Sequence, residues 1–170
     1  MPKSLALNLV AIAQAEVGTR EGKLNNTGAR IVEYQKATWL KPDAWSWCAA
    51  FVAWCMREWL NDIDVRTALR VLKIDTWRCH DASAFGWEKW AKIRGLKVLP
   101  DTDIAKAGDI VIFDFSHIGI VAEDQLSPAH NIKTIEGNTN SKGDRDSNSG
   151  DGVWQKSRNP ALVKCYIRLL

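Results

Sequence analysis

The 170-residue sequence predicts an α+β fold in which helices from the first half pack against an antiparallel sheet formed by the second half. Two patterns predict it. Up to Arg94, apolar residues recur at helical spacing, whereas from Leu96 onward short segments rich in Val and Ile alternate with Gly, Pro, Asn, Asp and Ser. Because 46% of residues are hydrophobic, 25% are charged and no Pro/Ser-rich linker occurs, we expect a single domain spanning residues 1–170.

The helical half is predicted to contain five segments: Leu5–Val17, Ala29–Lys36, Cys48 to about Leu60, a turn or two over Val65–Leu72, and a helix through Trp87 and Trp90 to Arg94. Ser4 is the expected cap of the first helix, and Gly18 is its expected end. The last helix is expected to start at Asp81 or Ser83 and to stop at Gly95.

The second half is predicted to form six short strands joined by tight loops: Leu96–Leu99, Asp109–Phe113, His117–Ala122, Lys133–Glu136, Val153–Lys156 and Lys164–Leu169. Gly, Pro, Asn, Asp and Ser separate them, as is typical of turns.

Composition excludes several classes of protein. The net charge of +3 comes from basic residues scattered among acidic ones, so we expect no nucleic-acid binding. No apolar run approaches the length needed to cross a bilayer, so no stable membrane insertion is expected. The four cysteines form no CxxC pair and indicate neither a zinc ribbon nor a dithiol redox motif, so we expect reduced thiols.

The N-terminal helix does not resemble a signal peptide, because Asn8, Gln14 and Glu16 interrupt its apolar residues. We therefore expect the protein to be made in the cytoplasm without a signal peptide. Separately, we expect it to be a monomer.

Cys48 is the first candidate catalytic residue, because an aromatic turn, Trp45-Ser46-Trp47, leads directly into its apolar helix. If Ser46 caps this helix, Cys48 lies in the first turn, where free backbone N–H groups and the helix dipole favour the nucleophilic thiolate. The alternative is an inert core cysteine, since Cys48 shares one helical face with Val52, Cys55 and Trp59.

The tryptophan content is high for this chain length, with nine tryptophans, and most are expected to pack in the core. Trp45 and Trp47, in the turn before the thiol, are the two that we assign to a substrate groove, because large amphipathic rings suit that position.

A nucleophilic cysteine needs a base, and the base needs a group that holds its tautomer. His117 follows a hairpin-like turn at the start of a predicted strand, which would fix its side chain on one face. Glu136 and Asn138 lie two residues apart, so they would share a face if their strand continues. Either can accept the imidazole N–H, and the sequence leaves that choice open. Each of these residues, taken alone, is more often structural.

Together, a cysteine that starts a helix after an aromatic turn, a Gly-Asp strand leading to His117-x-Gly, and a final Glu136-Gly-Asn138 resemble the CHAP family. These are the cysteine, histidine-dependent amidohydrolases/peptidases of the papain-like clan that cut peptidoglycan. The resemblance spans about Glu16 to Leu170 and implies a papain-like CHAP fold.

By this resemblance, Cys48 matches the nucleophile, His117 the general base and Glu136 the residue that orients the histidine, while Asn138 matches an accompanying polar residue. The implied mechanism is thiolate attack on an amide carbonyl, an acyl-enzyme and its hydrolysis by water. Backbone N–H groups at the start of the Cys48 helix would stabilise the oxyanion.

No cofactor or metal is expected. Some CHAP enzymes carry an acidic calcium loop before the cysteine, but the corresponding segment here has Asp43 as its one carboxylate. A second acidic loop, residues 144–152, begins like an EF-hand, yet it has Ser149 where Gly is needed and Gln155 where Glu is needed. A solvated loop is the favoured interpretation there, with calcium as the alternative.

The resemblance therefore implies a peptidoglycan hydrolase that acts at the bacterial cell wall or periplasm after release or delivery, like a compact endolysin. One alternative is an antibacterial cell-wall amidase effector that comes with an immunity protein. The others are a non-catalytic wall-binding or virion module and a papain-like enzyme that acts on other amides.

Overall fold

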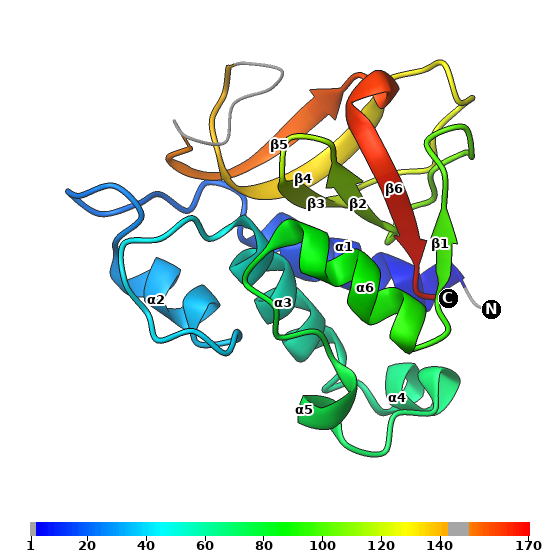
Figure 1. Ribbon diagram of the computed structural model, residues 1–170, viewed down its shortest axis with the longest axis horizontal. Coiled ribbons are helices and arrows are strands. Elements are labelled where there is room, and N and C mark those ends of the chain that lie inside the picture. Colours follow the sequence, from blue (N-terminus) through cyan, green and yellow to red (C-terminus); the bar gives the residue numbers. More distant parts are fainter. Residues whose placement is uncertain (1–2, 143–149) are drawn as a thin grey trace.

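The computed structural model describes residues 3–142 and 150–170 and confirms the α+β prediction, with helices below a twisted antiparallel sheet (Figure 1). The helices within the described residues are α1 (Lys3–Ala15), α2 (Ala29–Gln35), α3 (Cys48–Trp59), α4 (Ile63–Leu69), α5 (Ile74–Trp77) and α6 (Ala84–Ile93). The strands are β1 (Lys97–Leu99), β2 (Ile110–Phe113), β3 (His117–Val121), β4 (Ile132–Thr139), β5 (Gly152–Arg158) and β6 (Val163–Arg168), with a short 3₁₀ helix at Pro160–Leu162.

Every predicted helix and strand is present, but some details of the helix ends differ. Helix α1 begins at Lys3, so Ser4 lies inside it rather than capping it. Ser83 occupies the N-cap position of α6 without a side-chain capping bond, while the Asp81 carboxylate accepts a hydrogen bond from the Ser83 N–H at 2.8 Å. Gly18 and Gly95 both adopt positive φ just after their helices, as their predicted role as helix ends requires.

The sheet has the strand order β1-β6-β2-β3-β4-β5, and all its neighbouring strands run antiparallel. Strands β2 and β3 form a tight hairpin in which Phe113 lies opposite His117, and Ser116 takes a left-handed conformation (φ 60°) in the turn. This hairpin places His117 at the first position of β3.

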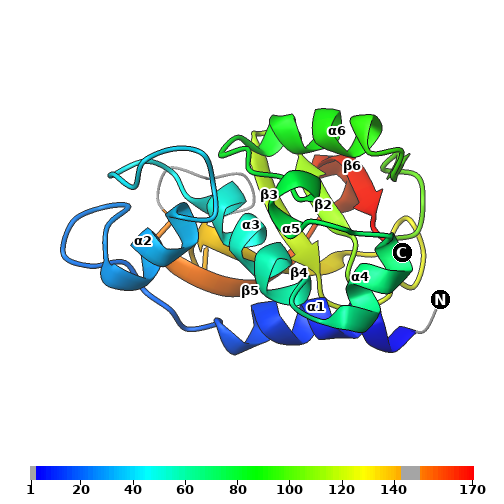
Figure 2. The same cartoon turned by 90° about the horizontal axis from the view of Figure 1, so that it is seen from below.

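Three helices cover one face of the sheet. Figure 2 shows α3 between α1 and α6, and α3 packs on α1 and on strands β3 and β4. The main core fills the space between these helices and the sheet, and it includes the isoleucines at 110, 112, 118, 120 and 135. A second apolar cluster, which includes Val111, Phe113 and Tyr166, lies on strand positions that alternate with the first. None of the helices in the described residues is long and apolar enough to cross a membrane.

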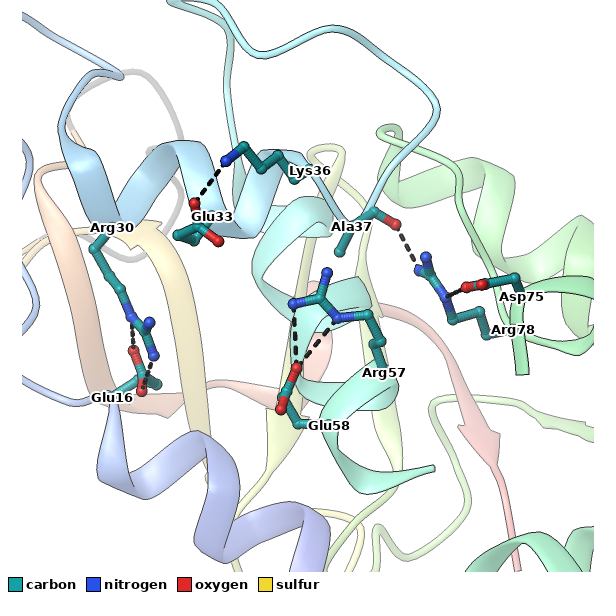
Figure 3. A network of polar contacts seen from close by, with 9 residues as sticks. All are labelled: Glu16, Arg30, Glu33, Lys36, Ala37, Arg57, Glu58, Asp75 and Arg78. Carbon is teal, nitrogen blue, oxygen red and sulfur yellow. Dashed lines mark hydrogen bonds and ion pairs between the residues drawn. The ribbon is translucent and has the colours of Figure 1, made fainter. Parts of the chain in front are cut away.

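Ion pairs and a side-chain hydrogen bond link neighbouring segments of the helical half (Figure 3). Arg30 on α2 forms a two-bond pair with Glu16, just after α1, at 2.7 and 2.9 Å. Arg78, after α5, pairs with Asp75 and also donates to the Ala37 carbonyl, which ties α5 to the turn after α2. These contacts join α2 and the turn after it to the segments that follow α1 and α5.

Candidate active site

Cys48 is the first residue of α3, and only 6% of its surface is exposed. The N-cap position belongs to Trp47 and has no side-chain capping bond, so the prediction that Ser46 caps the helix is wrong. Because no side chain occupies the free N–H groups of the first turn, they can donate to an oxyanion at the thiol. The predicted position of Cys48 in that turn is confirmed.

The other three cysteines, Cys55, Cys79 and Cys165, are free and buried. Burial raises the pKa of each of these thiols, to about 12 for Cys79. They therefore stay protonated at neutral pH, as is typical of structural cysteines.

Close packing brings the start of α3 against the sheet. A Cβ on Gly137 would lie 2.6 Å from Cβ of Phe51 and 2.8 Å from the Trp47 ring, so β4 touches the first turn of α3 at this residue. A Cβ on Gly119 would lie 2.7 Å from Cγ of Glu136. Because glycine has no Cβ, β3 can pass directly beside that side chain. Two glycines thus let β3, β4 and the helix start converge.

His117 is fully buried, and its Nε2 lies 2.7 Å from Oε2 of Glu136. Its ring stacks on Phe115 and Phe113, with centroids 5.6 and 6.0 Å apart. Nδ1 has no hydrogen-bond partner among the described residues. Burial alone would lower the pKa of His117, but Glu136 and the Cys48 thiol outweigh it and raise the pKa to about 9. We infer that Nδ1 is the nitrogen that faces the thiol.

Glu136 is also fully buried and accepts hydrogen bonds through both oxygens. Oε1 accepts from the Thr134 hydroxyl at 2.6 Å and from Nε of Arg158 at 2.9 Å, and Oε2 accepts from Nη2 of Arg158 at 2.6 Å as well as facing His117. Burial would raise the pKa of this carboxyl, but Arg158 and His117 lower it to about 2. The carboxylate is therefore ionised at neutral pH.

Asn138 does not share the face of Glu136, because a β-bulge interrupts β4 between Glu136 and Thr139. Asn138 has φ 53° and is buried, and its side chain makes no hydrogen bond to a described residue. Thr139, at the end of the bulge, instead accepts a hydrogen bond through its hydroxyl from Nη2 of Arg158 at 3.4 Å. Of the two candidates for the imidazole partner, the structure brings Glu136 to the ring.

Arg158 is the site residue that sequence reasoning missed. It is 1% exposed, at the end of β5, and its guanidinium lies over the Phe113 and Phe115 rings at 5.3 and 5.6 Å. Because 22 residues separate it from Glu136, only the pairing of β4 with β5 brings the two together. The predicted strand ended at Lys156, two residues before Arg158, so no sequence signal indicated a role for this arginine.

The two tryptophans assigned to a groove lie in different places. Trp47 is fully buried, stacks on Tyr34 and donates its indole N–H to Glu21 at 2.8 Å, so its assignment to the groove wall is wrong. Trp45 is half-buried and lines an apolar surface groove together with Trp39, Leu40 and Ser46. A groove wall beside the cysteine segment therefore does contain Trp45.

Within the described residues, no group of three or more His, Cys, Asp or Glu side chains is placed to hold a metal ion. Most of the 144–152 loop, which sequence reasoning considered for calcium, lies outside the described residues.

No curated protein and no solved structure shows a significant match to the chain. The family model described as CHAP domain matches residues 40–138, more than half of the chain, and this segment contains Cys48, His117, Glu136 and Asn138. Arg158 lies beyond the matched segment. The fold, the site geometry and this match together establish that the chain belongs to the CHAP family of cysteine- and histidine-dependent amidohydrolases and peptidases.

Proposed function

We propose that the protein is an endolysin-like peptidoglycan hydrolase that cleaves an amide bond in or next to the stem peptide with Cys48 as its nucleophile. One observation carries the proposal. Nε2 of the buried His117 is hydrogen-bonded to Glu136, and the thiol of Cys48, at the start of α3, raises the pKa of the same imidazole. A binding-only module would have no need for this arrangement.

The proposed reaction has two halves. His117 takes the proton of the Cys48 thiol, and the resulting thiolate attacks the amide carbonyl. N–H groups of the first turn of α3 stabilise the oxyanion, a contribution of about 3 kcal/mol per donor. The tetrahedral intermediate then breaks its C–N bond as His117 gives its proton to the leaving amine, which leaves an acyl-enzyme. In the second half, His117 takes a proton from water, the hydroxide attacks the thioester, and the acid product leaves with Cys48 restored.

Glu136 and Arg158 act on His117 rather than on the substrate. The carboxylate holds the ring in the orientation that points Nδ1 at the thiol and stabilises the imidazolium. Arg158 keeps that carboxylate charged and fixed. When the Cys48 proton moves to His117 in the reaction, the buried groups form a row of alternating charges: thiolate, imidazolium, carboxylate and guanidinium.

We place the activity at the bacterial cell wall, reached after release or delivery. The family supports peptidoglycan as the substrate, and the mild net charge of +3 would favour approach to an anionic wall. An antibacterial effector with an immunity protein would use the same site, and the lytic role is tested by adding the protein to intact cells after outer-membrane permeabilisation.

The proposal is tested by digestion of purified peptidoglycan with the wild type and Cys48→Ala, with the soluble products identified by mass spectrometry. The wild type should release fragments whose masses name the amide bond that is cut, and Cys48→Ala should release none. Cys55→Ala, two turns along the same helix, is the matched control and should keep activity. Equal release by wild type and Cys48→Ala, or none by a folded wild type, contradicts the proposal.

A further inference from the structure

Trp39 stands apart from the other eight tryptophans because it is the one that is exposed, to 79%. The other eight are buried or half-buried, and six donate their indole N–H within the protein: Trp45, Trp47, Trp59, Trp87, Trp90 and Trp154. The Trp39 indole makes no hydrogen bond to a described residue. Leu40, beside it in the chain, is 54% exposed and lines the same surface hollow, so the two side chains form an exposed apolar patch of the kind that marks a binding site.

The Trp39 ring is held rigidly. It stacks on His80 with centroids 5.3 Å apart and planes 7° from parallel, and the Trp39 backbone N–H donates to the His80 carbonyl at 3.1 Å. Nε2 of His80 lies 2.7 Å from the Asp75 carbonyl oxygen, which fixes the imidazole from its other side. Burial lowers the pKa of His80, so this ring is neutral at pH 7. The pair therefore forms a flat, uncharged platform with one face open to solvent.

Hollows of 370 and 410 Å³ flank the platform, and both are lined by Trp39, His80 and Asp81. Both volumes lie within the range of about 300–1,000 Å³ that is usual for small-ligand sites. The larger hollow continues to Trp45 and Ser46, and Ser46 is two residues before Cys48. The larger hollow therefore reaches the segment that directly precedes the candidate nucleophile in the chain.

We propose that the Trp39–His80 platform binds an N-acetylhexosamine ring of the peptidoglycan glycan strand, while the stem peptide extends along the groove toward Cys48. This inference rests on the proposed function. A pyranose ring presents a flat face of C–H groups that packs on an aromatic plane, and its equatorial hydroxyls reach outward to polar groups at the rim. Asp81, on the shared edge of both hollows, supplies a carboxylate acceptor there.

The charge of the larger hollow favours a sugar over the cationic or anionic parts of the wall, whereas charged side chains of both signs line the smaller hollow. The platform rings are neutral, and Asp81 is the one charged residue that lines the larger hollow. A single platform of this size matches one ring and its neighbours, whereas a stable protein partner would need a buried surface of roughly 800 Å² on this chain.

The first test is calorimetric binding of a tetramer of β-1,4-linked N-acetylglucosamine, which contains no stem peptide, to the full chain. The wild type should bind it, and Trp39→Ala should weaken binding about tenfold, the loss expected for one aromatic contact. Phe85→Ala, at an aromatic residue on α6 that is 41% exposed and outside both hollows, is the matched control and should bind like the wild type. Absence of wild-type binding, or equal binding by Trp39→Ala, overturns the proposal.

The second test separates this inference from the proposed function. On intact peptidoglycan, Trp39→Ala should raise KM about tenfold and leave kcat unchanged, because the platform binds substrate but does not touch the reacting bond. If the wild type binds the saccharide through Trp39 but hydrolyses no peptidoglycan, the subsite stands and the proposed function fails. If the wild type hydrolyses peptidoglycan and Trp39→Ala matches it in KM, the subsite fails alone.

Discussion

Two arginine–glutamate pairs in this protein have nearly the same geometry and different surroundings. Arg158 donates to Glu136 at 2.9 Å through Nε and 2.6 Å through Nη2, and Arg30 donates to Glu16 at 2.9 Å and 2.7 Å through the same two atoms. Each guanidinium also lies over two aromatic rings. Geometry alone therefore does not distinguish a pair at the site from a structural one.

The third partner and the burial distinguish them. Glu136 faces His117, and the side chains of Arg158 and Glu136 are 1% and 0% exposed. Glu16 instead accepts from the Tyr34 hydroxyl, and the Arg30 side chain is 44% exposed (Figure 3). Both carboxyls have a lowered pKa, since their hydrogen-bonded partners outweigh the effect of burial. The buried pair therefore sets the charge of a titrating histidine, whereas the partly exposed pair joins α2 to the end of α1.

The largest expected effect is that of Glu136→Gln, which should lower kcat/KM by roughly 10²–10⁴-fold because the imidazole loses its orienting carboxylate. Peptidoglycan turbidity clearing measures it. Since this change leaves a buried guanidinium without that carboxylate, the double variant Glu136→Gln/Arg158→Met serves as the folded control and should be equally inactive. Glu16→Gln, the matched change in the other pair, should retain activity, and a comparable loss there would remove the distinction between the pairs.

Arg158→Met should lower kcat/KM by about 10–100-fold, less than loss of the carboxylate itself, because Glu136 keeps its bond to His117. The acid limb of the pH–rate profile should move to higher pH, because the pKa of Glu136 rises when the guanidinium is removed. Arg158→Lys should restore part of the activity. A merely structural arginine would reduce the amount of folded protein and leave the pH profile of that fraction unchanged.

The pH dependence of stability should separate the pairs at high pH. The pKa of His117 is raised from 6.5 to about 9, so the stability that its charge contributes is complete below pH 6.5 and is lost as the pH rises through 9. Urea unfolding of the wild type should show this decline, and Glu136→Gln should flatten it. Glu16→Gln should keep it, since neither Glu16 nor Arg30 titrates in that window. The acid limb, from pH 4.5 downward, is common to both carboxyls because both have a lowered pKa.

The smallest effect is expected for Arg30→Met, which should lower the free energy of unfolding by about 1 kcal/mol or less, because the pair is partly exposed and screened by solvent. Activity should match the wild type. A loss of activity without a loss of stability would show that the exposed pair also acts on the site.

The fold could be predicted from sequence because it depends on local patterns. The Val- and Ile-rich segments became strands, and Gly95 ended α6 where its position indicated. Helix α5 was not predicted, because a single turn of four residues, Ile74–Trp77, carries no periodic signal. The Ser46 cap was wrong because the helix starts one residue later than a cap at Ser46 requires.

The site could be predicted only in part. Motifs along the chain predicted Cys48, His117 and Glu136 as site residues. The choice of Glu136 over Asn138 depends on the bulge in β4, and no residue type in the sequence predicts that bulge. Arg158 required the register of β4 with β5, a contact across sequence distance. Trp47 was assigned to the groove because the sequence does not show whether an indole is buried or exposed. Its complete burial and its hydrogen bond to Glu21 are visible only in the structure.

The pKa of His117 can be measured by an NMR titration of the imidazole resonances. This titration tests whether Glu136 and Arg158 keep His117 charged beside the Cys48 thiol. The chain has three histidines, and His80, whose pKa is lowered by burial, is an internal control that Glu136→Gln should not move. We expect a pKa of about 9 for His117 in the wild type and a large fall in the Glu136→Gln/Arg158→Met variant. A wild-type value at or below 6.5, or one unchanged in the variant, would contradict it.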